Sequence, residues 1–368
     1  MSKLNYKLLT PGPLTTTETV KKEMMFDHCT WDEDYKKITR DIREKLLKLA
    51  HVSSDEYTAV LIQGSGTFGV ESVLGSVIGE EDKLLIAANG AYGMRMADIA
   101  QRNKIKYDVY KTGYDEIPKA EEITRILNEN HDITHVSMVH SETTSGILND
   151  IASVSKAVKE AGRIMIVDAM SSFGGVDIPV GDLGIDFIIS SANKCIQGVP
   201  GFAFIICKKS VLENSKGNAR SLSLDLYDQW KTMEIDGKWR FTSPTHTVLA
   251  FSKALEELEE EGGIPARNKR YSENNKLLID SMRKMGFKTY VSDENQGPII
   301  TTFFYPDNKN YTFDEMYQYI KERGYAIYPG KVTDAETFRI GNIGEIYKED
   351  IEKLCGIIKD FLNLKENL

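Results

Sequence analysis

Two residues that lie 26 positions apart indicate the chemistry that this sequence can support. Asp168 closes the apolar run 164–168, and Lys194 ends the run Ser-Ser-Ala-Asn-Lys at 190–194. A lysine that forms a Schiff base and a carboxylate that keeps a ring nitrogen protonated are what pyridoxal phosphate (PLP) requires of a protein. Taken singly, each residue has an ordinary alternative, because Asp often occupies turns and most lysines are solvated.

A glycine-rich segment at 63–71 lies between the first expected strand and the first expected helix. Ser65, Gly66 and Thr67 place amides and hydroxyls at a helix N-terminus, where phosphates bind. The Lys-Ser/Thr ending of a P-loop is missing, and the second strand ends in Ala-Ala-Asn without the acid that a dinucleotide's ribose requires. An ordinary glycine-rich turn explains the segment equally well.

Two further expected strands are followed by residues suited to a planar cofactor. Tyr92 offers an aromatic face for stacking, and Thr143 offers a hydroxyl. A surface aromatic is the simpler interpretation of Tyr92 alone, and a polar turn is that of the segment 140–146. However, these residues and those described above all follow strands, at the edge where open α/β sheets bind ligands. Five suitable segments at five strand ends favour a cofactor site.

Two residues near the ends of the chain are candidates for contacts with a substrate. Arg339 lies on an expected strand between Phe338 and Ile340, and its guanidinium can hold an oxyanion through two parallel hydrogen bonds. The usual alternative for such an arginine is a surface ion pair. Gly12, in the rigid segment Thr-Pro-Gly-Pro-Leu at 10–14, can pass close to a ligand or simply belong to the chain's entry into the fold.

Short apolar runs alternate with amphipathic stretches of helical length, which is typical of a mostly parallel sheet covered on both faces. We therefore expect an α/β fold with a seven-stranded sheet in a large domain, followed by a smaller α+β domain. The expected division is an N-terminal segment 1–20, a large domain 21–260 and a small C-terminal domain 261–368. The run 202–207 follows the preceding strand too closely for a crossover helix, so we expect it to be antiparallel.

The patterns also predict individual elements. Strands are expected at 59–63, 84–88, 106–110, 135–140, 164–168, 187–191 and 202–207, and in the small domain near 287–291, 299–305, 325–328 and 337–340. Helices are expected at 69–78, 93–103, 117–130, 151–161, 248–261, 266–285, 313–323 and 348–364.

The composition is that of an ordinary globular protein, with 41% hydrophobic and 27% charged residues. A net charge of −9 argues against nucleic-acid or anionic-membrane partners. No apolar run approaches the ~18–20 residues of a membrane span, and the N-terminus lacks the apolar stretch of a signal peptide. The four cysteines are widely spaced and form no metal-ligand grouping with histidine. We expect a cytoplasmic protein with reduced thiols and no metal site.

In this order and over nearly the whole chain, these motifs resemble those of the fold-type I, class V aminotransferases, which use PLP. The resembling stretches are 10–13, 64–67, 88–95, 140–146, 167–175, 190–194 and 338–341. The resemblance implies that Lys194 is the Schiff-base lysine and general base, and that Asp168 is the partner of the ring nitrogen.

The same resemblance implies roles for the remaining candidates. Those with cofactor roles are Ser65, Gly66 and Thr67 at the phosphate, Tyr92 stacked on the ring, Thr143 near the ring oxygen, and Met170 and Asn193 as further contacts. The family forms homodimers with shared sites, and Thr242 matches the position that reaches the PLP phosphate of a partner subunit. Arg339 matches the arginine that binds the substrate's acidic group, with Gly12 as a second substrate contact.

The segment 27–35, Asp-His-Cys-Thr-Trp-Asp-Glu-Asp-Tyr, resembles the phosphonate branch of the family. It implies transamination of 2-aminoethylphosphonate with pyruvate to phosphonoacetaldehyde and L-alanine, a step of phosphonate degradation. Alanine:glyoxylate or serine:pyruvate transamination is the first alternative, since it uses the same cofactor residues. A cysteine desulfurase is a weaker one, because Cys195 is too close to Lys194 to face the substrate as well. The remote alternative is a non-enzymatic nucleotide-binding α/β protein.

Overall fold

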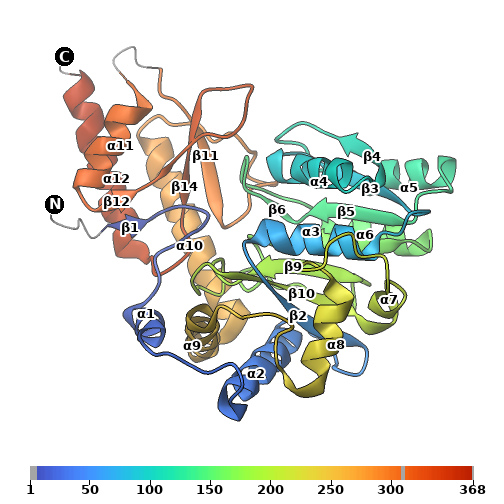
Figure 1. Cartoon of the computed structure of the whole chain (residues 1–368). Helices are drawn as coiled ribbons and strands as arrows, with labels where there is room; N and C mark the ends of the chain where they lie inside the picture. Colours follow the sequence, from blue (N-terminus) through green and yellow to red (C-terminus); the bar gives the residue numbers. More distant parts are fainter. Residues whose placement is uncertain (1–5, 308–310, 367–368) are drawn as a thin grey trace.

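The computed structural model describes residues 6–307 and 311–366 of the chain. Its centre is a seven-stranded sheet. The strands are, in chain order, β2 (Tyr57–Gln63), β3 (Lys83–Ala88), β4 (Lys106–Lys111), β5 (His135–Val139), β8 (Ile164–Asp168), β9 (Phe187–Ser191) and β10 (Phe202–Lys208). They lie in the order β2-β10-β9-β8-β5-β3-β4 (Figure 1).

The pairing of these strands confirms the expected mostly parallel sheet. β3 pairs in parallel with β4 and β5, and β8 pairs in parallel with β5 and β9. β10 is antiparallel to both of its neighbours, β2 and β9, as the short link before it predicts. Every residue of β5 and β9 is buried, which explains why these segments are continuous apolar runs.

Helices cover this sheet on both faces (Figure 1). They are α2 (Glu33–Leu49), α3 (Gly66–Val77), α4 (Ala91–Arg102), α5 (Ala120–Glu129), α6 (Ile151–Glu160), α7 (Lys209–Glu213), α8 (Leu226–Asp236) and α9 (Thr245–Glu261). Two short elements, α1 (Glu18–Lys22) and the 3-10 turn Glu23–Met25, precede α2, and a small hairpin of β6 (Ser141–Glu142) and β7 (Ile147–Leu148) follows β5. Among the described residues, no helix combines the length and apolarity that crossing a membrane demands.

A smaller three-stranded antiparallel sheet lies in the C-terminal part, with the order β11-β14-β13. Its strands are β11 (Ile300–Phe304), β13 (Tyr328–Pro329) and β14 (Thr337–Gly341), and the helices beside it are α10 (Gly263–Lys284), α11 (Phe313–Glu322) and α12 (Lys348–Glu366). Its apolar core includes Phe287, Phe303 and Phe338, whose rings pack against one another.

The N-terminal segment packs against this smaller part. β1 (Lys7–Leu8) pairs in parallel with β12 (Tyr325–Ala326), and Leu9 is fully buried in the C-terminal apolar cluster. The main cluster, around the large sheet, draws its residues from between Val20 and Leu258. The proposed division into segments 1–20, 21–260 and 261–368 stays a prediction.

Several predicted elements need correction. No strand forms near 287–291, where Thr289 makes a single bridge to Phe303 before the chain turns away. The expected strand 325–328 is divided, because β12 pairs with β1 whereas β13 pairs with β14. Helices α2 and α8 were not predicted. The buried positions Tyr35, Thr39, Ile42 and Leu46 of α2 have the helical spacing that reveals such a helix in a sequence.

Candidate active site

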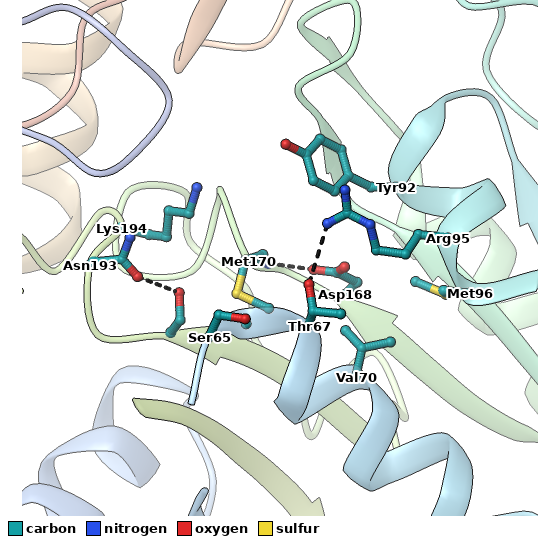
Figure 2. Close-up of a pocket in the computed structure, with 12 residues that line it drawn as sticks. Ser65, Thr67, Val70, Tyr92, Arg95, Met96, Asp168, Met170, Asn193 and Lys194 are labelled. Atoms are coloured by element: carbon teal, nitrogen blue, oxygen red, sulfur yellow. Dashed lines mark hydrogen bonds between the residues drawn. The ribbon is translucent and has the colours of Figure 1, made fainter. Parts of the chain in front are cut away.

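A cavity of about 200 Å³ opens at the carboxyl-end edge of the large sheet (Figure 2). Its lining includes all but one of the cofactor residues expected from its own subunit, namely Ser65, Gly66, Thr67, Tyr92, Asp168, Met170, Asn193 and Lys194. The exception is Thr143, which is buried beside the cavity. The lining residues lie at or just after the ends of β2, β3, β8 and β9, and Thr143 follows β5; the sheet brings them together because these strands end at one edge.

The N-terminus of α3 forms one wall of the cavity. Ser65 is its N-cap and makes no side-chain capping bond, so its hydroxyl is available to a ligand. The first amides of a helix have no partner within the helix and attract anions. A Cβ at Gly66 would lie 2.3 Å from Sδ of Met170, so a larger residue there would require the Met170 side chain to move. The free hydroxyl of Ser65 and the first amides of α3 fit a phosphate group.

Asp168 lies at the end of β8 and is only 6% exposed. Its Oδ1 accepts a hydrogen bond of 2.8 Å from the backbone N–H of Met170. Burial raises the pKa of the Asp168 carboxyl to about 6, and the nearby charge of Glu142 adds to this, whereas Lys194 and Arg95 oppose it. Among the described residues no cation forms an ion pair with this carboxylate. A buried carboxylate of this kind suits a ligand that carries a protonated ring nitrogen.

Lys194 projects into the same cavity from the lysine loop, residues 192–198 between β9 and β10 (Figure 2). Its Nζ donates a 2.8 Å hydrogen bond to the carbonyl oxygen of Pro11. Burial lowers the pKa of this ammonium group below its ordinary value, although the surrounding Tyr92, Cys195 and Asp168 raise it. A lysine with a lowered pKa has more of the neutral amine that acts as a nucleophile or a base.

Tyr92 lies in the first turn of α4, which Glu142 holds in place. The buried Glu142 carboxylate accepts hydrogen bonds from the backbone N–H groups of Tyr92 and Gly93, at 3.1 and 3.2 Å. The guanidinium of Arg95 lies under the Tyr92 ring, 4.9 Å from its centroid, and donates to the Thr67 hydroxyl at 3.3 Å (Figure 2). Sequence reasoning did not assign roles to Arg95 and Glu142, although Arg95 follows Tyr92 by one helical turn and this spacing was visible.

Arg339 reaches the large domain from strand β14, and it is buried rather than a surface ion pair. Its Nη1 donates to the carbonyl oxygen of Thr143 at 2.8 Å, and its Nε donates to that of Pro329 at 3.0 Å. Burial lowers the pKa of this guanidinium, whereas Tyr92, Tyr328 and Glu142 raise it. Arg339 thus lies at the edge of the cavity without lining it.

The remaining two candidates also lie outside the cavity lining. Gly12 crosses Lys194 directly, since a Cβ at this glycine would lie 2.8 Å from Nζ of Lys194. Thr242 is exposed, in the segment that precedes α9. The structure therefore brings Gly12 to the lysine and leaves Thr242 on the surface of the subunit.

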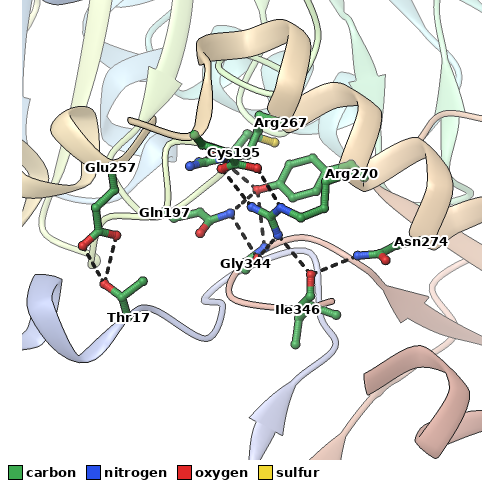
Figure 3. Close-up of polar contacts among 11 residues, drawn as sticks. Thr17, Cys195, Gln197, Glu257, Arg267, Arg270, Asn274, Gly344 and Ile346 are labelled. Carbon is green, nitrogen blue, oxygen red and sulfur yellow. Dashed lines mark hydrogen bonds and ion pairs between the residues drawn. The ribbon is translucent and has the colours of Figure 1, made fainter. Parts of the chain in front are cut away.

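A network of buried polar groups supports the lysine loop from behind (Figure 3). Arg267, only 2% exposed, donates to the carbonyl oxygen of Cys195 at 2.7 Å and pairs with Glu261 at 2.6 Å. Glu261 also pairs with Arg270 at 2.7 Å, and Arg270 donates to the carbonyl oxygen of Gly344 at 2.8 Å. The lysine loop, helix α10 and the chain after β14 are thus joined by one set of charges.

Cys195 itself is fully buried, which agrees with a packing role. Its thiol donates to the carbonyl oxygen of Ser171 at 3.3 Å, and burial raises the pKa of this thiol to about 12. Because the thiolate is the reactive form of cysteine, this side chain is inert at neutral pH.

Comparison with known proteins decides the family. Residues 27–345 match the family described as aminotransferase class-V. The chain belongs to the class-V aminotransferase family. This class-V enzyme is 57% identical over 363 residues to the 2-aminoethylphosphonate--pyruvate transaminase of Lysinibacillus sphaericus, with 99% of each chain covered.

Solved structures share the fold of this class-V aminotransferase. The ureidoglycine-glyoxylate aminotransferase of Bacillus subtilis has a TM-score of 0.90 at 22% identity, covering 100% of this chain and 95% of its own. A PLP-bound phosphoserine aminotransferase from Trichomonas vaginalis has a TM-score of 0.76 at 16% identity, covering 96% and 99%. These likenesses confirm the expected fold-type I architecture.

Proposed function

We propose that this class-V aminotransferase uses PLP to transfer the amino group of 2-aminoethylphosphonate to pyruvate, giving phosphonoacetaldehyde and L-alanine. The observation that carries the proposal is the shared cavity of Lys194 and Asp168 at the N-terminus of α3. The substrate pair is supported by the 57% identity to a transaminase of that name over 99% of both chains.

The residues of the cavity fit PLP at each of its functional groups. Ser65, Gly66 and Thr67 would hold the phosphate at the helix N-terminus, and Tyr92 offers an aromatic face for the ring. Asp168 keeps the ring nitrogen protonated, and Met170 and Asn193 lie along the same wall. When it is bound, PLP supplies a ring that accepts electrons from the substrate carbon.

Lys194 is the residue that moves the proton. Its amine would hold PLP in the resting enzyme and, once freed by the substrate, would act as the base that takes a proton from the substrate carbon. Burial favours this role because it lowers the pKa of Lys194 and so increases the neutral fraction. Pro11 and Gly12 hold the amine at the cavity, through the 2.8 Å bond to the Pro11 carbonyl.

Arg339 serves the acidic groups of both substrates in turn, first the phosphonate and then the carboxylate of pyruvate. Its planar guanidinium has N–H groups left over from the two carbonyls that it contacts, and it matches the geometry of either anion. Thr242, exposed on its own subunit, completes the phosphate site of a partner in a homodimer. We also propose that the enzyme works in the cytoplasm and that its reaction is a step of phosphonate degradation.

The test is product formation by the purified, PLP-loaded protein. It is incubated with 2-aminoethylphosphonate and pyruvate, and in parallel with L-alanine and glyoxylate or with L-serine and pyruvate. We expect alanine and phosphonoacetaldehyde in equal amounts from the first pair, and none with Lys194→Ala. If the enzyme instead turns over L-alanine with glyoxylate or L-serine with pyruvate, and does not turn over 2-aminoethylphosphonate, the result would support the alanine:glyoxylate or serine:pyruvate alternative.

A further inference from the structure

A second cation, Lys331, lies over Tyr92, which lines the cavity. Its Nζ is 3.7 Å from the centroid of the Tyr92 ring. Lys331 follows β13 by two residues, and Arg339 donates to the carbonyl oxygen of Pro329, the last residue of that strand. The two cations are therefore held by one strand pair of the small domain, since Tyr328 is the register partner of Arg339.

The charges of both residues act on the groups around Lys194. Lys331 lowers the pKa of Tyr92, against the larger opposing effect of burial, and it also contributes to the lowered pKa of Lys194. Tyr92 and Glu142 are in turn among the groups that raise the pKa of Arg339. Lys331 thus lies over Tyr92, and Arg339 is close enough for the charge of Tyr92 to act on it.

Neither cation has a direct ion-pair partner, although the charge of the buried Glu142 reaches both of them. Within the described part of the chain, no carboxylate pairs with Lys331 or with Arg339. The segment around Lys331 is nevertheless fixed, because Thr333 shares a 3.0 Å hydrogen bond with Tyr114 and Asp334 accepts one of 2.7 Å from Tyr290. A lysine that is held over an active site without an ion-pair partner is suited to bind an anion.

We propose that Lys331 and Arg339 together bind the phosphonate as a dianion, and that Lys331 is the residue that selects a doubly charged acidic group over a singly charged one. This inference rests on the proposed function, and it names the residue that gives the enzyme its preference for a phosphonate substrate. The carboxylate of pyruvate, a single charge, requires only Arg339. Lys331 is a point charge on a flexible stem, so it supplements the planar fork of Arg339 rather than duplicating it.

The test compares two unreactive anions of the same tetrahedral shape, ethylphosphonate and ethanesulfonate, as competitive inhibitors. At about pH 8.5 the phosphonate carries a second negative charge that the sulfonate lacks. We expect the wild-type enzyme to bind ethylphosphonate about ten-fold to a hundred-fold more tightly than ethanesulfonate, which is the range for one charge-assisted contact. Lys331→Gln should remove most of this preference, and Lys331→Arg should keep it.

Lys348→Gln is the matched control, because it removes an exposed small-domain lysine that pairs only with Glu352 on the surface. If Lys331→Gln weakens both anions equally, Lys331 merely positions Tyr92, and the inference is wrong. It is also wrong if the variant keeps the wild-type preference. A wild-type enzyme that transfers no amino group from 2-aminoethylphosphonate contradicts the proposed function instead, whatever Lys331→Gln does to inhibitor binding.

Discussion

The carbonyl oxygen of Pro11 accepts a 2.8 Å hydrogen bond from Nζ of Lys194, which lies 183 residues further along the chain. The N-terminal segment is therefore part of the active site and not only an entry to the fold. The next residue, Gly12, has φ of +122° and crosses the lysine so closely that a side chain there would displace the end of Lys194. The backbone at Pro11 and Gly12 thus fixes where the amine of Lys194 lies.

Gly12→Ala tests this contact. The new Cβ would lie 2.8 Å from Nζ of Lys194, in a backbone conformation that disfavours any side chain. We expect kcat to fall by at least about ten-fold, because displacing a reacting group by a fraction of an ångström has a large effect on rate. The control is Gly217→Ala, which has a similar strain, with φ of +86°, but no atom within 4 Å of the added Cβ. It should cost about 1 kcal/mol of stability and leave kcat unchanged. Equal kcat for the two variants would contradict the role of Gly12.

Asp168 makes the cofactor-free protein less stable at neutral pH. Its pKa rises from 3.8 to about 6 on folding, so the folded protein must bury a charge above pH 6 that the unfolded chain keeps in water. This cost is largest above pH 6, shrinks as the pH falls towards 3.8, and vanishes below that. Asp168→Asn should therefore stabilise the cofactor-free protein at pH about 8 by about 1–3 kcal/mol, while abolishing transamination.

Thermal unfolding of cofactor-free protein at several pH values measures the effect of Asp168→Asn. The gain over the wild-type protein should become smaller as the pH is lowered through 6. A gain that is the same at every pH, or a loss of stability at pH about 8, would show that the Asp168 carboxylate is not strained by burial.

Arg267 should stabilise both the fold and the lysine loop. Arg267→Met removes the closer of the two donors to the Cys195 carbonyl, leaving only the Tyr271 hydroxyl at 3.4 Å, and it removes one of the two arginines that neutralise Glu261. Breaking a buried ion pair in this way typically costs about 3–5 kcal/mol. On the same helix, Arg283→Met removes an exposed pair with Asp293 and should cost at most about 1 kcal/mol.

Urea unfolding of both variants compares these free energies directly, and the visible spectrum of the PLP-loaded protein reports on the loop. We expect the visible band of the Arg267 variant alone to change with pH at a different midpoint from that of the wild-type protein. The reason is that the lysine that carries the chromophore has lost the support of its loop. Equal destabilisation by the two variants would contradict the prediction that the buried network stabilises the fold more than a surface ion pair does.

Thr242 can be tested by mixing inactive subunits. Thr242→Arg should block the phosphate site of the partner, and Lys194→Ala removes the reactive amine from its own site. In a mixed dimer one site then carries both changes and the other carries neither, so activity should return to at most half of the wild-type value. If Thr242 instead served its own subunit, each site would keep one defect and mixing would restore nothing.

The sequence was most informative where candidate functional residues come directly after buried strands. The predicted bounds 164–168 and 187–191 coincide with β8 and β9, because continuous apolar runs specify such strands strongly. The cofactor residues that follow these strands lie together because parallel strands end at one edge, which a strand pattern alone can predict.

Contacts between distant segments could not be predicted in this way. No local pattern places Pro11 against Lys194, or Lys331 over Tyr92, because both depend on how the N-terminal segment and the small domain pack on the large sheet. The segment 287–291 illustrates the same limit, since its apolar residues suit a strand but tertiary packing leaves Thr289 with a single bridge. The charged network behind Cys195 likewise joins the lysine loop, α9, α10 and the chain after β14.

The most direct measurement of the central claim is the first half of the reaction, followed by absorbance. The PLP-loaded protein is mixed separately with 2-aminoethylphosphonate, L-alanine and L-serine, in the absence of any amino acceptor. We expect rapid loss of the visible band of the lysine-bound cofactor with the phosphonate, and L-alanine as product once pyruvate is added. Loss of the band with L-serine or L-alanine but none with the phosphonate would contradict the proposed substrate, and the absence of any band would contradict the assignment of Lys194.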